Sequence, residues 1–121
     1  MSSRYSDRLL DHFRHPRNCG ELPPPAVVVE VENPVCGDVL RLWAEVASGI
    51  VRRVRFQASG CTASIAAGSA LTELLTGRSV AELSALGADA VERALDGLPA
   101  ESRHAAVLCA DAVKALLRAA G

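Results

Sequence analysis

Two alternating segments joined by a short turn place the strongest limit on how this chain can fold. Apolar side chains recur at every second position in residues 39–46, and again at Val54 and Phe56 in residues 50–57, with Ser48-Gly49 between the two segments. A period of two is the pattern of a strand with one buried face. The sequence therefore predicts an antiparallel β-hairpin whose other face is exposed to solvent.

A helix and a strand are expected before this hairpin. Ser6 can cap the first turn of the helix, and Pro16 ends it. Residues 27–31 are rich in β-branched side chains and predict a strand. The predicted apolar stripe of the helix consists of Leu9, Leu10 and Phe13.

After the hairpin the pattern becomes helical. The first helix is expected from Ala63 to Leu75, and small residues at positions 66–70 would let it lie close to the sheet. Further helices are expected at residues 79–83, 89–95 and 103–119. The predicted fold class is α+β, with a three-stranded antiparallel sheet and helices packed on one face. We expect a single domain over residues 1–121.

Composition argues against several classes of function. The net charge of −1 creates no overall field that would attract nucleic acid or an anionic membrane. Aromatic residues make up 3%, and none alternates with basic residues as in a base-stacking surface. There is no secretory hydrophobic segment and no apolar run long enough to span a bilayer, so a cytoplasmic location is expected. There, the four cysteines would serve metal binding, sulfur chemistry or packing rather than disulfides.

Two cysteines lie at the same end of the predicted hairpin. Cys36 stands in Asn33-Pro-Val-Cys-Gly-Asp38 before the first hairpin strand, and Cys61 follows Gly60 where the second strand gives way to a helix. Antiparallel pairing brings these positions together, so Cys36, Asp38 and Cys61 should converge on one edge. Convergent thiolates are typical of a shared metal site. Taken singly, a β-turn with an incidental thiol would explain Cys36, and packing at a helix start would explain Cys61.

The other histidines and cysteines have simpler interpretations. His104 opens the last helix and could supply an imidazole to the same site, although alone it would be a solvated capping group. His12 and His15 lie three residues apart with no thiol or carboxylate beside them, and both are expected on the surface. Cys19 is expected to be exposed in a turn, and Cys109 to pack in the core.

Four segments occur in the order and spacing of motifs from one known family. They are Tyr5-Ser6 with Asp11-His12 and His15-Pro-Arg-Asn18, then Asn33-Pro-Val-Cys-Gly-Asp38, then residues 56–69, and finally Thr76-Gly-Arg-Ser79. On these motifs the chain resembles the U-type iron–sulfur cluster assembly scaffolds, the family of IscU, SufU and the amino-terminal domain of NifU. The resemblance extends over almost the whole chain.

The resemblance implies a carrier protein rather than an enzyme. Members of this family bind iron, accept sulfur from a cysteine desulfurase, assemble a [2Fe-2S] cluster and transfer it to acceptor apo-proteins. Three cysteines and an aspartate do this work, often with a histidine before the third cysteine. Cys36, Asp38 and Cys61 match this pattern, and the last helix aligns His104 with the family histidine and Ala105 with the third cysteine.

Ala105 is therefore a departure from the family pattern. Cys109 lies one helical turn beyond it, which displaces a side chain by about 5–6 Å along the axis. Metal–thiolate bonds tolerate only about ±0.2 Å. We expect a metal site built from Cys36, Asp38, Cys61 and His104, the alternative being that Cys109 serves after a local rearrangement. Such a set suits either zinc or a [2Fe-2S] cluster with mixed ligands.

Three functions compete on this basis. The first is the iron–sulfur scaffold, and the second is a zinc-binding sulfur acceptor that activates a cysteine desulfurase, as in the SufU branch. The third is a thiol transferase with Cys61 as nucleophile, which would lack a resolving thiol and an oriented base. The IscU branch carries a chaperone-recognised proline-valine-lysine peptide where this chain has Ala100-Glu101-Ser102, so recognition by that chaperone is not predicted. The insertion typical of the SufU branch, between Cys61 and His104, is also missing.

Overall fold

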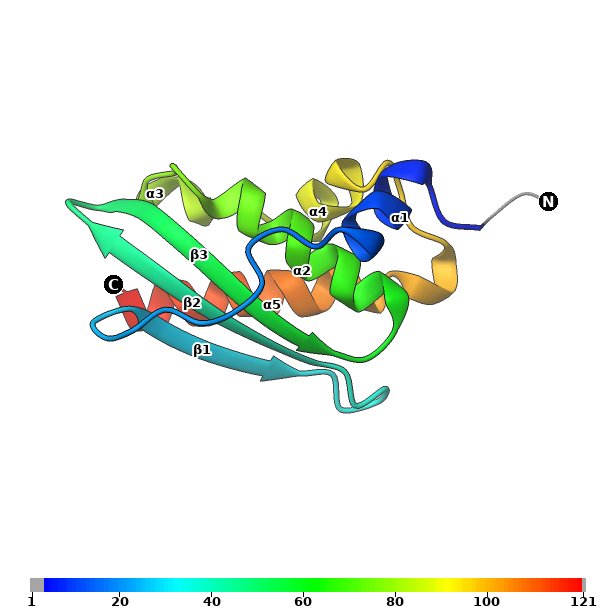
Figure 1. Ribbon diagram of the computed structural model, residues 1–121, viewed down its shortest axis with the longest axis horizontal. Coiled ribbons are helices and arrows are strands. Elements are labelled where there is room, and N and C mark those ends of the chain that lie inside the picture. The colour runs from blue at the N-terminus through cyan, green and yellow to red at the C-terminus, as the bar shows by residue number, and fades with distance from the viewer. Residues whose placement is uncertain (1–3, 121) are drawn as a thin grey trace.

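The computed structural model describes residues 4–120 and has the predicted α+β architecture (Figure 1). The first three residues and the last of the predicted 1–121 unit lie outside this description. The elements are α1 (Asp7–Arg14), β1 (Val27–Glu32), β2 (Val39–Ala47), β3 (Ile50–Ser59), α2 (Thr62–Leu75), α3 (Val80–Leu83), α4 (Ala88–Ala94), a 3₁₀ turn (Ala100–Ser102) and α5 (His104–Ala120).

The three strands form one antiparallel sheet in the order β1-β2-β3. At one end of the β2–β3 ladder Val39 pairs with Ser59, and at the other Ala47 pairs with Ile50 beside the Ser48-Gly49 turn. The same register continued by one step sets Asp38 opposite Gly60. The predicted hairpin is therefore correct, and its open end carries the cysteine-containing segments.

Helices α2 and α5 cover one face of the sheet, with α2 against β3 and α5 against β1 (Figure 1). The small residues of α2 allow a close approach, because a Cβ added at Gly68 would lie 2.7 Å from the Phe56 ring. Burial of Leu40, Leu42 and Phe56 between sheet and helices stabilises this arrangement. The position of α2 brings its first turn to the open end of the hairpin.

The opposite face of the sheet is not fully exposed to solvent. Residues 18–20 run beside β3, where Phe56 N donates to Asn18 O at 2.9 Å and Gly20 N donates to Phe56 O at 3.0 Å. The chain then crosses the sheet to reach β1 (Figure 1). Leu22 and Trp43 are both buried, so the predicted exposure of this face is wrong at Trp43.

Helix α1 has the predicted N-cap but a different buried face. Leu9 N donates to Ser6 Oγ at 3.0 Å. His12 is only 6% exposed, whereas Phe13 is 36% exposed. The prediction that His12 lies on the surface and Phe13 in the apolar stripe is therefore wrong. His12 follows Leu9 by three residues and shares its helix face, and Ser69 of α2 provides a polar partner there.

Among the described residues, no helix combines the length and the apolar character needed to cross a membrane.

Candidate metal centre

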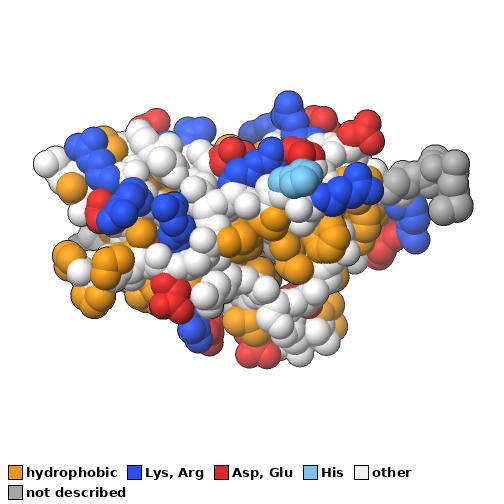
Figure 2. Space-filling view, viewed as in Figure 1, with side chains coloured by type: hydrophobic (Ala, Val, Ile, Leu, Met, Phe, Trp, Pro, Cys, Tyr) orange, Lys and Arg blue, Asp and Glu red, His pale blue; other side chains and the backbone are white. Residues whose placement is uncertain are grey.

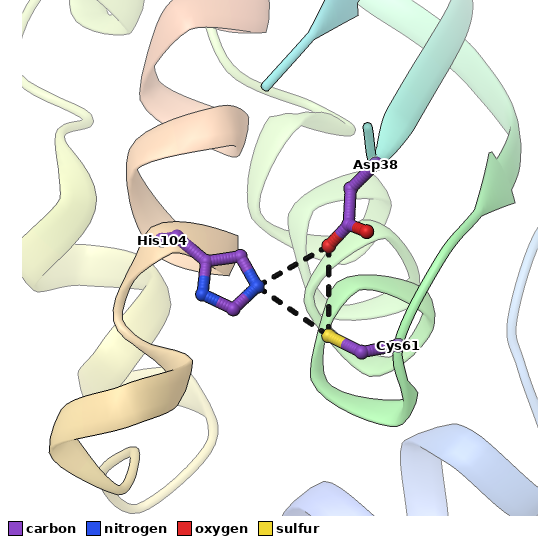
Figure 3. Close-up of side chains that lie close together, drawn as sticks. All are labelled: Asp38, Cys61 and His104. Atoms are coloured by element: carbon purple, nitrogen blue, oxygen red, sulfur yellow. Dashed lines mark hydrogen bonds and ion pairs between the residues drawn. The ribbon is translucent and has the colours of Figure 1, made fainter. Parts of the chain in front are cut away.

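Three side chains from separate parts of the chain meet at the open end of the hairpin (Figure 3). Asp38 Oδ2 lies 3.2 Å from His104 Nε2 and 3.6 Å from Cys61 Sγ. Cys61 Sγ lies 3.6 Å from His104 Nε2. Within residues 4–120 this is the one group of three or more His, Cys, Asp or Glu side chains close enough to hold a common metal ion.

The loop between β1 and β2 holds Asp38 in place. Asn33 Oδ1 accepts hydrogen bonds from Val35 N at 2.9 Å and Cys36 N at 3.3 Å. Gly37 N donates to Asn33 O at 2.7 Å, and Asn33 N donates to Asp38 O at 2.8 Å. These four bonds close a tight turn that directs the buried Asp38 carboxylate toward α2 and α5.

Gly60 lets the carboxylate come close to the backbone that precedes Cys61. Its φ of +148° is disfavoured for other residues, and an added Cβ would lie 2.4 Å from Asp38 Oδ1. Cys61 then serves as the N-cap residue of α2, with no cap hydrogen bond from its side chain. The sulfur is consequently free to face Asp38 and His104.

His104 is oriented by the 3₁₀ turn that precedes α5. Its Nδ1 lies 3.1 Å from the Glu101 carbonyl oxygen, which can only accept, so Nδ1 carries the hydrogen of this bond. In the neutral ring this leaves the Nε2 lone pair directed at Asp38 and Cys61. A histidine held through its second nitrogen in this way is typical of metal ligands.

Ser64, which the sequence analysis did not single out, completes the buried part of the site. Its hydroxyl donates to Asp38 Oδ2 at 2.6 Å and lies 3.3 Å from Cys61 Sγ. The only sequence signal for it was its place three residues after Cys61, in the first turn of a predicted helix.

Cys36 is the predicted ligand that does not join this group. It lies at the same end of the sheet, two residues before Asp38, but its side chain is exposed on the loop between β1 and β2. Cys19 is exposed and Cys109 is buried, as predicted. Burial raises the pKa of the Cys109 thiol to about 12. Ala105 is also buried, in the hydrophobic core.

The spacing of the three donor atoms fits one tetrahedral metal ion. Metal–ligand bonds of about 2.0–2.3 Å, as in zinc sites, place neighbouring donors of a tetrahedron about 3.3–3.7 Å apart. The three observed separations are 3.2, 3.6 and 3.6 Å. The three donors therefore have the separations that three corners of such a tetrahedron require.

Comparison with known proteins assigns the chain to a family. The model of the NifU-like N terminal domain matches residues 4–119. The chain belongs to this family. The iron-sulfur cluster assembly scaffold protein IscU 1 of Archaeoglobus fulgidus is 40% identical over 110 residues, which cover 91% of this chain and 72% of that protein. The IscU scaffold protein of Azotobacter vinelandii is 37% identical over 118 residues, covering 94% of this chain and 91% of that protein.

The NifU-like fold is also found among solved structures. A nitrogen-fixing NifU-like protein (N-terminal) from Brucella abortus superimposes with a TM-score of 0.64 at 22% identity, covering 97% of this chain and 83% of that one. This likeness concerns the fold. The sheet and the packed helices of this chain are therefore those of the NifU-like N-terminal domain.

Proposed function

We propose that this protein is a scaffold that binds iron, accepts sulfur from a cysteine desulfurase, assembles a [2Fe-2S] cluster and passes it to acceptor apo-proteins. The observation that supports the proposal is the convergence of Asp38, Cys61 and His104 at one end of the sheet. Relatives at 40% and 37% identity carry the name of iron-sulfur cluster assembly scaffold. The proposed role is that of a carrier, with no chemistry on an organic substrate.

The proposed ligand set is Cys36, Asp38, Cys61 and His104. The last three stand at tetrahedral spacing. Cys36 would supply the fourth ligand by movement of its loop, in which Gly37 has a φ of +75° and open space around it. Sulfur and nitrogen donors suit iron–sulfur clusters and zinc, whereas the Asp38 carboxylate is a harder and more exchangeable ligand. An exchangeable ligand suits a carrier that must release its cargo.

Cys36 is also the thiol that we propose as the first sulfur acceptor. It is exposed beside the metal centre, whereas Cys61 is half-buried and in contact with three side chains. In the transfer step the Cys36 thiolate attacks the outer sulfur of a desulfurase persulfide. A new sulfur–sulfur bond forms on Cys36, the old one breaks, and its electron pair leaves with the desulfurase thiolate, so that no external oxidant is needed.

The proposed partners are a cysteine desulfurase and acceptor apo-proteins, in the cytoplasm. The four cysteines are free in the structure, which fits a reducing compartment. The region that follows Leu98-Pro99 forms the 3₁₀ turn Ala100–Ser102 that orients His104. We therefore propose that this region helps to build the metal site.

One observation favours a second function, that of a zinc-binding sulfur acceptor which activates a desulfurase. The Asp38, Cys61 and His104 donors are close enough to share one ion, whereas a [2Fe-2S] cluster distributes its protein ligands over two irons. The close triangle suits a single zinc, with Cys36 as the fourth and reactive ligand.

Anaerobic reconstitution distinguishes the two functions. The protein would be incubated with a cysteine desulfurase, cysteine, ferrous iron and a thiol reductant that converts persulfide sulfur to sulfide, and then mixed with an apo-ferredoxin. The scaffold function predicts a visible cluster chromophore that moves to the ferredoxin. A colourless protein that retains one zinc and increases desulfurase turnover would support the second function. Failure of both would contradict the proposal.

A further inference from the structure

Ser64 contacts two of the proposed ligands, and among the described residues its hydroxyl makes its side-chain hydrogen bonds with these two. It is 2% exposed, and its hydroxyl contacts Asp38 Oδ2 at 2.6 Å and Cys61 Sγ at 3.3 Å. Its backbone N–H donates to Cys61 O at 3.1 Å, within the first turn of α2. A buried hydroxyl destabilises the fold unless it is hydrogen-bonded, and here its partners belong to the metal site.

The oxygen of Asp38 that Ser64 contacts is the one that faces the site. Oδ2 points toward Cys61 Sγ and His104 Nε2, whereas Oδ1 lies on the side of Gly60. A carboxylate turns readily about its last torsion, and its two oxygens are equivalent, so neighbouring groups must fix the plane in which it lies. The absence of a Cβ at Gly60 leaves room for Oδ1, and the Ser64 hydroxyl bonds to Oδ2 on the other side of the carboxylate.

We propose that Ser64 is a positioning residue that holds the Asp38 carboxylate with Oδ2 directed at the metal. The inference deepens the proposed function and rests on it. Groups that orient metal ligands in this way raise metal affinity, and their removal typically costs about 10–100-fold. Ser64 acts through Asp38, and its effect depends on that carboxylate being present.

The chain offers a matched control in the same helix. Ser69 is also fully buried in α2, but its hydroxyl contacts His12 Nδ1 at 2.7 Å and Arg17 N at 2.9 Å, away from the metal centre. Ser64→Ala and Ser69→Ala remove the same group from one helix. Only the first should change metal binding.

The test is anaerobic titration with cobalt(II) against a competing chelator, read by the thiolate charge-transfer and ligand-field absorption of the bound ion. Wild type, Ser64→Ala, Ser69→Ala, Asp38→Ala and the double variant Asp38→Ala/Ser64→Ala would be compared. Ser64→Ala should weaken cobalt binding about 10-fold or more, whereas Ser69→Ala should bind as wild type does. In the Asp38→Ala background, Ser64→Ala should have no further effect. Circular dichroism would verify that each variant is folded.

Two results would overturn the inference while leaving the metal site in place. One is a Ser64→Ala protein that binds cobalt as tightly as wild type. The other is a loss of affinity that persists in full without Asp38, which would mean that Ser64 acts on the fold or on Cys61. If wild type itself bound no cobalt, the proposed function would fail and the inference with it, and that outcome is recognisable because all five proteins would behave alike.

Discussion

Two polar clusters form around buried serines of helix α2, one at Ser64 and one at Ser69, and each combines a serine with a histidine and a carboxylate. At Ser69, His12 Nδ1 contacts the hydroxyl at 2.7 Å and Nε2 lies 3.5 Å from Glu73 Oε1. At Ser64, His104 Nδ1 is hydrogen-bonded to the Glu101 carbonyl oxygen, and Nε2 of the same ring faces Asp38 and Cys61. The residue types are similar, but the surroundings differ.

The difference shows what separates a structural histidine from a candidate ligand. Burial lowers the pKa of His12, and nearby Arg17 lowers it further. The Ser69 hydroxyl is shared between His12 and the Arg17 backbone, so this cluster joins α1, α2 and the segment after α1. Around His104, by contrast, a sulfur, a nitrogen and an oxygen converge at tetrahedral spacing. Convergence of three possible donor atoms, rather than the mere presence of a histidine, marks the candidate metal centre.

The largest effect is expected from removing the thiol that distinguishes the two clusters. Cys61→Ala deletes the one thiolate donor among Asp38, Cys61 and His104. Loss of a residue that only orients a metal ligand lowers affinity about 10–100-fold, so loss of a ligand itself should lower zinc affinity by at least about 100-fold. His12→Ala should leave zinc affinity unchanged while lowering stability. Competition with a chromophoric chelator measures both variants, and equal zinc affinity for Cys61→Ala and wild type would refute the comparison.

A backbone substitution should weaken the metal centre without touching a ligand. In Gly60→Ala the new methyl group would meet Asp38 Oδ1 at 2.4 Å, so the carboxylate must move. We expect zinc affinity to fall about 10–100-fold, as for other disturbed ligand supports.

Gly77→Ala is the matched control for this substitution. Gly77 also has a positive φ, of +89°, but a Cβ there would meet no atom within 4 Å. Both variants should lose about 1–3 kcal/mol of stability from backbone strain, and only Gly60→Ala should lose metal affinity. Equal zinc affinity for Gly60→Ala and Gly77→Ala would show that the missing side chain at Gly60 is not needed for the position of Asp38.

The cluster at Ser69 should make the stability of the protein depend on pH through His12. The folded-state pKa of His12 lies below the ordinary value of 6.5, because burial disfavours the charged ring, with Arg17 and Arg8 adding to the effect and Glu73 and Asp11 opposing it. The unfolded chain therefore binds the proton more readily, and the stability contributed by neutral His12 is complete above about pH 6.5 and is lost as the pH falls below it.

Urea unfolding of the metal-free protein at a series of pH values tests this prediction. His12→Asn keeps an acceptor near Ser69 but cannot be protonated, so its stability should decline less between neutral pH and pH 5 than that of wild type. Parallel curves for the two proteins would contradict a buried neutral His12.

The smallest effect is expected at Cys109. It is buried in the core, and burial raises the pKa of its thiol to about 12, which leaves almost no thiolate near neutral pH. Cys109→Ala should cost on the order of 1 kcal/mol of stability and leave metal content unchanged.

Mass spectrometry after treatment with a desulfurase should find the persulfide on Cys36, and a persulfide on Cys109 would show that the acceptor thiol has moved along α5.

Much of the fold follows from local patterns. The alternation of residues 39–46 and 50–57 and the Ser48-Gly49 turn predict the hairpin, and antiparallel pairing predicts that Asp38 and Cys61 lie at the same end of it. A register shift between Glu45 and Val46, which no local pattern reveals, sets Asp38 opposite Gly60 rather than Ser59. His104 is proposed as a possible ligand from its place at the start of the last helix, and the family resemblance aligns it with the family histidine, because no local pattern relates the start of α5 to the hairpin.

The features that sequence reasoning missed depend on tertiary contacts. His12 has the polarity of a surface residue, and only the presence of Ser69 on the facing helix explains its burial. Trp43 is buried on the outer face of the sheet, where Arg41 lies over its ring at 5.8 Å and the segment before β1 crosses the sheet, and alternation within β2 does not reveal this (Figure 1). Figure 2 shows hydrophobic side chains gathered near the middle of the view, with Lys and Arg side chains both toward the end where β3 begins and over the region of α1. This surface distribution of hydrophobic and basic side chains depends on how the helices and strands pack together, and the pattern of a single segment does not predict it.

X-ray absorption at the zinc edge of the zinc-loaded protein tests the central claim most directly. If Asp38, Cys61 and His104 bind the metal, the first shell should contain sulfur at about 2.3 Å together with nitrogen or oxygen at about 2.0–2.1 Å, and imidazole scattering should disappear in His104→Ala. A shell made only of oxygen and nitrogen, or a spectrum that His104→Ala leaves unchanged, would contradict the assignment of this site.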